Sequence, residues 1–228
     1  MSAAPLHAPY PTPQRQTFEG TWCRLEPLNP TLHGDQLHEA IAGPEAERLH
    51  RYLADPIPAS RADFDSWLIP KSASTDPMFF AVIDRTTNRV EGRQSLMDIA
   101  PAHGTAEIGH ILWGPRIAGT RIATEAFFLL ADHMMTALAY RRWQWRCNAA
   151  NAPSRRAAER FGFTYEGTFR NHMVVKGENR DTAWFSITDT EWPPVRARFQ
   201  AWIAPSNFTA EGQQRTRLAP LTPTSQKE

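Results

Sequence analysis

The residues from Arg116 to Ile122 lie where a backbone anion site can form. Glu107 to Trp113 reads as a strand, Gly114-Pro115 marks a turn, and a helix follows whose apolar residues recur at 3.6-residue spacing: Ile122, Ala126, Leu129, Leu130, Met134, Ala137 and Leu138. The first turn of a helix has N–H groups without intrahelical acceptors and the positive end of the helix dipole. The loop is therefore predicted to hold a phosphate group through its main chain.

The letters of this loop narrow the choice of phosphate ligand. Neither G-x-x-x-x-G-K-[ST] nor G-x-G-x-x-G occurs, which argues against a nucleotide P-loop and a dinucleotide fold. The loop reads Arg116-Ile117-Ala118-Gly119-Thr120-Arg121-Ile122 and continues as Ala123-Thr124-Glu125-Ala126. It resembles the [QR]-x-x-G-x-[GA] loop and following A-T-E-A of the GCN5-related N-acetyltransferases (GNAT), in particular their ribosomal-protein-alanine acetyltransferase-like branch. Arg121 departs from this pattern, because the family usually has Gly or Ala there.

A second motif in the expected order supports the resemblance. Asn151, Ser154, Gly162 and Phe163 match the N-x-x-S and G-F of the family, and Tyr165-Glu166-Gly167, Arg170 and Arg180-Asp181 resemble its E-G…R…R-D run. The resemblance covers about residues 18 to 192. It implies acetyl-CoA as cofactor, with the amides of residues 116–122 on the pyrophosphate and Asn151 and Ser154 beside the pantetheine arm. Arg156 or Arg155 is a candidate for contact with the ribose phosphate of the cofactor. A solvated helix face is the alternative for Arg156.

Transfer of an acetyl group to an amine needs a base. Deprotonating a lysine side chain at neutral pH costs about 4 kcal/mol and an α-amine only about 1 kcal/mol. Glu107, on the central strand, is the candidate base, acting through a water, as a Glu on this strand does in similar family members. The alternative is a structural carboxylate paired with an arginine.

The leaving thiolate needs only modest help, because a free thiol has a pKa of about 8.5. Many relatives use a Tyr on the short helix, but residues 154–162 contain none, so Ser154 is the candidate acid. A simple N-cap is the alternative for Ser154. Main-chain N–H groups near Ile108 and Gly109 are candidates for stabilising the oxyanion.

These features predict an N-acetyltransferase that moves acetyl directly to a primary amine in a ternary complex. Neither Cys23 nor Cys147 lies in a motif typical of a nucleophile. The acceptor is either a protein or peptide N-terminal α-amine or a small-molecule amine. The alternative function is a non-catalytic acyl-CoA-binding module, and RNA binding through Arg141-Arg142 and the neighbouring tryptophans is a third hypothesis. No metal is expected, since the histidines have no ligand-spaced partners.

Several further elements must position these residues. Strands are predicted at 21–27, 78–83, 90–99, 143–147, 167–175 and 182–188, and helices at 30–42, 61–68 (capped by Ser60) and 154–161 (ended by Gly162). This order predicts an α/β (α+β) fold with a mixed sheet. The resemblance implies the GNAT fold: a mostly antiparallel central sheet with a splayed parallel strand pair and helices on both faces.

Composition sets the remaining expectations. The chain has 228 residues, 41% of them hydrophobic, and a formal net charge of +1, so neither nucleic acid nor a membrane is an expected partner. Two cysteines without metal spacing and the lack of a signal-peptide pattern favour a cytoplasmic protein. Residues 1–15 and 205–228 are predicted to be disordered tails around one domain at 16–204. A homodimer is a family-level expectation.

Overall fold

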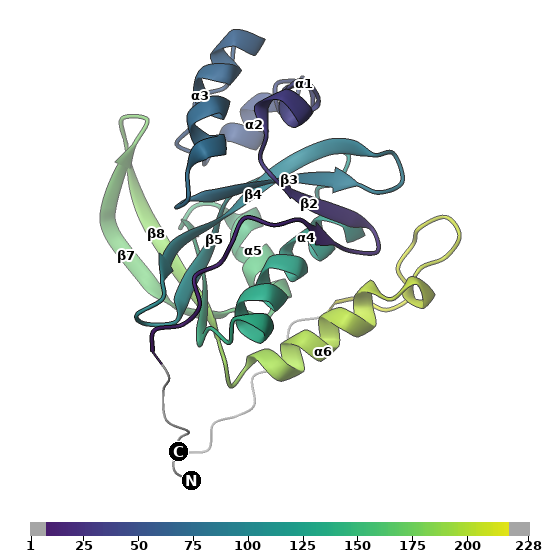
Figure 1. The fold of residues 1–228 in the computed structure, drawn as a ribbon. Coiled ribbons are helices and arrows are strands. Elements are labelled where there is room, and N and C mark those ends of the chain that lie inside the picture. Colours follow the sequence, from purple (N-terminus) through teal and green to yellow (C-terminus); the bar gives the residue numbers. More distant parts are fainter. Residues whose placement is uncertain (1–7, 219–228) are drawn as a thin grey trace. The chain divides into compact units, whose positions relative to one another are not determined.

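A computed structural model describes residues 8–218 (Figure 1). Contacts divide the chain into two compact units, Met1–Gln144 and Trp145–Glu228. Of the predicted tails at 1–15 and 205–228, residues 1–7 and 219–228 lie outside the described part of the chain. The domain boundaries at 16 and 204 stay predictions.

The first unit is built on a mixed sheet. Five strands run antiparallel to their neighbours, and β5 also pairs in parallel with the beginning of β6, through Thr105↔Arg142 and Glu107↔Gln144. The prediction of a mostly antiparallel mixed sheet with one parallel pair is confirmed. The strands are β1 (Phe18–Glu19), β2 (Cys23–Pro27), β3 (Met78–Asp84), β4 (Arg89–Ala100), β5 (Thr105–Trp113) and β6 (Arg142–Asn148).

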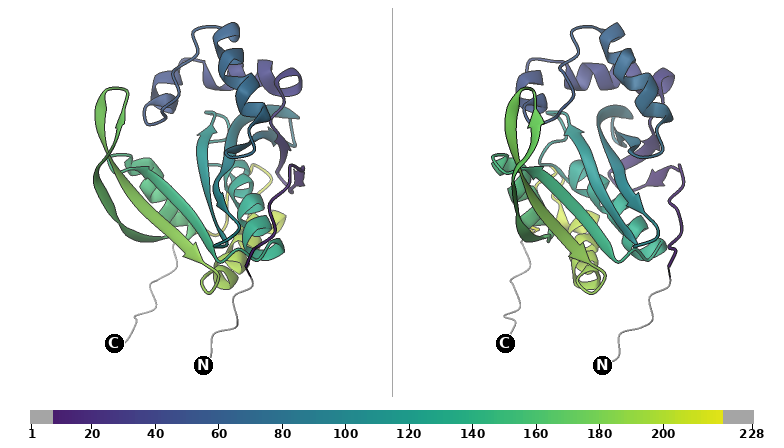
Figure 2. Two further views of the ribbon diagram at one scale, coloured as in Figure 1. Left: turned by 60° about the vertical axis from the view of Figure 1, so that its left-hand side comes forward. Right: turned by 90° about the vertical axis from the view of Figure 1, so that its left-hand side faces the viewer.

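Helices cover both faces of this sheet. Phe79, Ala81 and Ile83 of β3 belong to one apolar core with α1 (Pro30–Ile41) and α3 (Arg61–Ala73). Since side chains alternate along a strand, the buried Phe80 and Val82 face the other side, where α4 (Arg121–Asp132) lies. Figures 1 and 2 show α1, the short α2 (Ala46–His50) and α3 gathered at one end of the unit.

Side chains cap the starts of α1 and α3, and of these two caps only Ser60 was predicted. Asn29 caps α1 by accepting from the amides of Thr31 and Leu32, and Ser60 caps α3 by accepting from the amide of Asp63. Helix α3 continues to Ala73, beyond its predicted end at residue 68.

The predicted apolar face of α4 is partly wrong. Ala126, Leu130 and Met134 are buried as expected, but Ala137 is exposed and lies in a π-helical turn, His133–Ala137. The buried face instead includes Ala123, Phe127 and Ala131. Almost every side chain from Ile122 to Ala131 is apolar, so the spacing alone permits a rotated face.

The strands β4 and β5 are bulged where they pair. Their register shifts between Arg93 and Ser95 and again between Met97 and Ala100, and His110 has a positive φ of 48°. A bulge bends a strand and re-aims its side chains. Strand β5 continues from Ile108 to Trp113 beyond its last pair with β6.

The second unit combines a long hairpin with two helices. In this unit β6 neighbours β8 (Glu178–Thr188). Strand β8 pairs with β7 (Thr164–Val175) around a turn at Gly177, as predicted. Figure 2 shows this hairpin as a long twisted ribbon. Helix α5 (Ala152–Phe161) ends at Gly162, whose φ of 95° suits glycine. Helix α6 (Trp192–Ile203) and a 3-10 turn (Pro205–Asn207) were not predicted.

Both predicted tail segments make contacts where they are described. The amide of Tyr10 donates to the carbonyl of Pro101 at 2.8 Å, and its ring lies 5.6 Å from that of Tyr140. In the second unit Asn207 Nδ2 donates to the Trp202 carbonyl at 2.9 Å, and Leu218 is buried.

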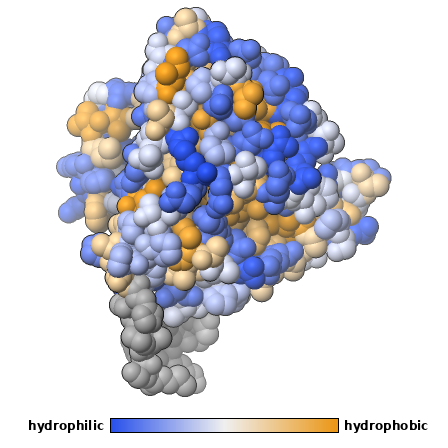
Figure 3. Space-filling model, viewed as in Figure 1, coloured by the Kyte–Doolittle hydropathy of each residue, from blue (hydrophilic) through white to orange (hydrophobic). Residues whose placement is uncertain are grey.

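Polar and apolar residues alternate as a mosaic on the face seen in Figure 3. Within residues 8–218, no helix is both long enough and apolar enough to cross a membrane.

Candidate functional site

The loop before α4 is held tightly by its own main chain. The amide of Gly114 donates to the carbonyl of Glu91, those of Ile117 and Ala118 donate to the carbonyl of Gly114, and that of Thr120 donates to the carbonyl of Ile117. Gly119 has a φ of 75°, and a Cβ added there would meet no atom within 4 Å. Within residues 8–218, the Gly119 N–H donates to no main-chain acceptor, so it is available to an external acceptor.

Thr120 begins α4 directly after this loop. Its Oγ1 donates to the Ile117 carbonyl at 2.7 Å and accepts from the Ile122 amide at 3.2 Å. The loop and the helix N-terminus thus form one rigid turn. Because the amides of Ile117, Ala118, Thr120 and Ile122 already donate within the protein, the turn offers an anion the Gly119 N–H and the positive end of the helix dipole.

Arg116, at the start of the loop, is anchored to β4. Its Nε donates to both carboxylate oxygens of Glu91 at 2.8 Å, and Glu91 is only 2% exposed. The side chain of Arg116 is 54% exposed, and its Nη2 lies 3.9 Å from Glu39 Oε1. Glu91 is a site residue that sequence reasoning missed, because no motif connects it with the loop.

Arg121 replaces the small residue of the family pattern without backbone strain. It is the first residue of α4 and lies outside the left-handed region. Its guanidinium stacks over the ring of Trp22, 3.7 Å from the centroid. The position therefore accommodates a long side chain because an aromatic surface lies beside it.

Glu125, the acidic residue of the Ala-Thr-Glu-Ala run, has a structural role. Its buried carboxylate accepts from the amides of Thr21, Trp22 and Cys23 at 2.7, 2.6 and 2.8 Å. These bonds tie the turn between β1 and β2 to the first turns of α4. Burial, reinforced by the nearby Glu125 carboxylate, raises the pKa of the Cys23 thiol well above its usual value.

Glu107, the predicted base, is buried in the sheet of the first unit. It is 1% exposed and sits on β5 between Met97 of β4 and Gln144 of β6. Three residues further, the bulge at His110 is held by Arg93, whose Nη1 donates to the His110 carbonyl at 2.8 Å. The first unit thus carries Glu107 and the bulge on β5, and the loop of residues 116–122 follows the end of that strand.

The second unit holds the other predicted residues at the start of α5. Asn151 is the N-cap, since its Oδ1 accepts from the Ser154 amide at 3.1 Å, so the N-cap interpretation of Ser154 is wrong. Ser154 Oγ accepts from the indole Nε1 of Trp145 at 3.0 Å. Arg156 is exposed, whereas the neighbouring Arg155 lies over the ring of Tyr165.

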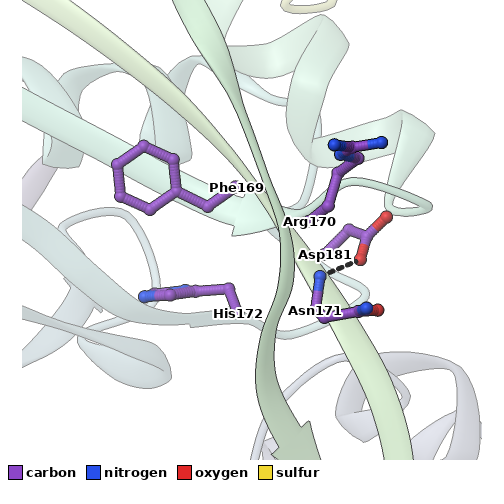
Figure 4. Close-up of a pocket in the computed structure, with 5 residues that line it drawn as sticks. All are labelled: Phe169, Arg170, Asn171, His172 and Asp181. Carbon is purple, nitrogen blue, oxygen red and sulfur yellow. Dashed lines mark hydrogen bonds between the residues drawn. The ribbon is translucent and has the colours of Figure 1, made fainter.

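A hollow of about 830 Å³ marks the hairpin of the second unit (Figure 4). Asn171, with a φ of 50°, donates its amide to Asp181 Oδ1 at 2.7 Å, and this bond lowers the pKa of the Asp181 carboxyl. Phe169 and His172 point to the opposite side of the ribbon from Arg170, and their rings lie 5.5 Å apart. The hollow thus has an aromatic side and a charged side.

Comparison with known proteins identifies the family. Residues 23–164 match the model of the acetyltransferase (GNAT) domain. A GCN5-related N-acetyltransferase from Brucella melitensis is 54% identical, with a TM-score of 0.91 over 92% of this chain and 95% of that one. A GNAT-family protein from Chromobacterium violaceum is 36% identical, with a TM-score of 0.76 over 84% of this chain and 97% of that one.

A more distant structure shares the fold. The acetyl transferase from Salmonella typhimurium that modifies the N-terminal serine of ribosomal protein L7/L12 is 19% identical, with a TM-score of 0.67 over 76% of this chain and 99% of that one. No curated protein matches the chain. The matched domain model spans more than half of the sequence. The chain therefore belongs to the GNAT family and is an acetyltransferase with the GNAT fold.

Proposed function

We propose that this acetyltransferase moves the acetyl group of acetyl-CoA directly to a primary amine within a ternary complex. The acceptor is a protein N-terminal α-amine or a small-molecule amine. The observation that carries the proposal is the loop before α4, where the Gly119 N–H has no main-chain acceptor within residues 8–218 and stands at a helix N-terminus. We assign the pyrophosphate of coenzyme A to the loop of residues 116–122, with the Gly119 N–H as a donor.

The remaining cofactor contacts are assigned to α5. Asn151 uses its Oδ1 to cap the helix, which leaves its Nδ2 as a donor toward the pantetheine arm. Arg156 is exposed and long enough to contact a phosphate. Acetyl-CoA supplies a thioester, which is an activated acetyl group with a thiol as leaving group.

Glu107 is proposed as the base that takes a proton from the acceptor ammonium. An α-amine has a pKa of about 7.7 to 8.0, so its deprotonation at neutral pH costs only about 1 kcal/mol. Because Glu107 is almost fully buried, a water is needed to relay the proton. Main-chain N–H groups near Ile108 and Gly109 are the proposed donors to the acetyl oxygen.

Ser154 is proposed to protonate the leaving thiolate. Its Oγ already accepts the indole N–H of Trp145, which orients the hydroxyl and leaves its own proton for donation. Trp145 is thus a positioning residue.

Burial of both cysteines supports direct transfer. Cys23 is fully buried, Cys147 is nearly so, and the pKa of Cys23 is raised, so neither thiol is poised as a nucleophile.

The test is release of free thiol from acetyl-CoA with a panel of primary amines and N-terminal peptides. Glu107→Gln keeps the volume of the side chain and removes the base, so turnover should fall about 10²- to 10⁴-fold. Calorimetry should find the affinity for acetyl-CoA unchanged. Glu47→Gln, on the exposed side of α2, is the matched control and should keep full turnover.

Two results would contradict this proposal. If Glu107→Gln turned over as fast as the unmodified enzyme, Glu107 would not be the base. Tight acetyl-CoA binding without thiol release for any amine would contradict transfer to a primary amine.

A further inference from the structure

A cavity of about 340 Å³ lies in the first unit, among α1, α3, β4 and the segment between α2 and α3. This volume is at the lower end of the range for ligand sites, roughly 300 to 1,000 Å³. It suits a small molecule or a single peptide residue. The loop, Glu107 and α5 residues assigned above do not line it.

Asp55 provides an ionised carboxylate in the wall of this cavity. Its Oδ2 accepts from Arg93 Nη2 at 2.7 Å and lies 4.0 Å from His110 Nδ1. Burial opposes ionisation, but the Arg93 guanidinium and the other neighbours outweigh it, so the pKa of Asp55 lies below its usual value. A carboxylate accepts about four hydrogen bonds, so Asp55 has capacity beyond its interactions with Arg93 and Trp67.

The formal charge of the cavity wall is negative. Asp55 and Asp63 contribute two carboxylates to the lining, and Arg93 contributes one guanidinium. His50 also lines the cavity and is counted as neutral in this formal charge. A negative wall in a confined site attracts cations. A primary amine in water is such a cation at neutral pH.

The rest of the wall is apolar and partly aromatic. Phe64 and Trp67 lie stacked, 5.7 Å between centroids and 12° between planes, and Pro56, Ile57 and Pro58 add an aliphatic side. Flat aromatic walls favour an apolar or aromatic body. The cavity thus combines one anionic point with an apolar interior.

The cavity shares a side chain with the bulge of β5. Arg93 is 1% exposed; one of its terminal nitrogens donates to Asp55 and the other to the carbonyl of His110. His110 directly follows Gly109, whose main chain is a proposed donor to the acetyl oxygen. A molecule held by Asp55 would therefore lie beside the strand on which Glu107 sits.

We propose that this cavity binds the acceptor, and that the acceptor is a primary amine on an apolar or aromatic body whose ammonium is held by Asp55. The inference rests on the proposed function, because it specifies the substrate class of the same reaction. Amines that carry a carboxylate beside the nitrogen should be poor acceptors, since a second anion would face Asp55.

Binding without chemistry gives the first test. Phenethylamine, its neutral analogue 2-phenylethanol and the anion 3-phenylpropanoate are titrated by calorimetry against the full chain. The amine should bind more tightly than both analogues. Asp55→Asn should lower the affinity for the amine by about tenfold or more and leave the affinity for the alcohol unchanged. Asp35→Asn, an exposed carboxylate on α1, is the matched control and should change neither affinity.

A second variant covers the case in which Asp55→Asn fails to fold after Arg93 loses its partner. Ile57 lines the cavity and is 41% exposed, so Ile57→Ser should fold normally. It should reduce the preference for phenethylamine over ethylamine, read as the ratio of kcat/KM values, by about threefold or more.

The outcomes separate this inference from the proposed function. Thiol release with amines whose KM is unaffected by Asp55→Asn and Ile57→Ser would overturn the inference and keep the function. Asp55-dependent amine binding without thiol release would support the inference and contradict the proposed function. Equal affinity for the amine and the alcohol in the unmodified protein would also overturn the inference.

Discussion

Arg116 and Glu91 form a contact that anchors the proposed phosphate-binding loop of residues 116–122. The guanidinium spans both oxygens of a carboxylate that is almost fully buried, and the main-chain carbonyl of Glu91 also accepts from Gly114. Hydrogen bonds to charged groups contribute about 1.5 to 3 kcal/mol. We therefore expect Glu91 to position the loop for acetyl-CoA without contacting it.

Replacing Glu91 with Gln should weaken acetyl-CoA binding. The amide keeps the volume but turns a donor toward the guanidinium, so the loop loses its anchor. The KM for acetyl-CoA should rise about tenfold, with the KM for the amine nearly unchanged. Steady-state kinetics with each substrate varied in turn would measure this effect.

Glu39→Gln is the control for that experiment. Glu39 lies 3.9 Å from Arg116 and is 61% exposed, so its loss should change the KM for acetyl-CoA less than twofold, as expected for a weak surface pair. Equal effects of the two substitutions would show that the buried contact has no special role.

Individual residues differed in how far they could be predicted. The loop of residues 116–122 was located from the strand, Gly119 and helix pattern alone. Glu91 could not be located in this way, because it lies 25 positions before Arg116 in the sequence and no motif links the two residues. For α5 the sequence suggested Ser154 as a possible N-cap, and the structure assigns the cap to Asn151 instead.

At the scale of elements, Glu125 connects α4 with the turn between β1 and β2. Three main-chain donors converge on one buried carboxylate, and Arg121 one helical turn earlier stacks on Trp22 of the same turn. The first helical turns that carry the loop are thereby fixed to the edge of the sheet.

Glu125→Gln should destabilise the first unit. The amide NH₂ would face main-chain donors, which leaves at least one buried N–H without an acceptor, at a cost of about 1 to 3 kcal/mol. Urea unfolding should give a lower midpoint with an unchanged slope. Glu159→Gln, on an exposed position of α5, should leave the midpoint in place, and an equal loss in both variants would contradict the role of Glu125.

Element types were easier to predict than their faces and ends. The strands β3 and β4 and the helix α1 were found within one or two residues because turns and caps bound them. For α4, residues 122–131 are apolar on nearly all sides, so periodicity could not select the face that includes Phe127. Helix α6 had a usable signal in the spacing of Trp192, Val195, Phe199 and Trp202.

At the scale of the whole molecule, no sequence motif marks the chain beyond the predicted boundary at residue 204. The described residues beyond it nevertheless make contacts. Phe208 and Leu218 are buried, Trp202 Nε1 donates to Gln214 Oε1 at 3.0 Å, and the amide of Thr216 donates to Asn207 Oδ1 at 2.9 Å. Because most residues of 205–218 are polar, the burial of these few apolar side chains could not be predicted from composition.

Two truncations test this boundary. A chain ending at Ala204 should be less stable than one ending at Leu218 by about 2 to 4 kcal/mol, since two apolar side chains and several hydrogen bonds are lost. Thermal unfolding of the two truncated chains measures the difference. Identical midpoints would support a domain that ends at residue 204.

The carboxylate of Glu125 also determines which substitutions the chain can accumulate. Its three partners are main-chain N–H groups, which every residue except proline supplies. Position 21 should therefore tolerate substitution by any residue type that has an N–H. Gly20 is not, because a Cβ there would lie 2.5 Å from Glu125 Cδ. In a library of variants covering residues 20 and 21, selection would keep glycine at the first position and accept almost any residue but proline at the second.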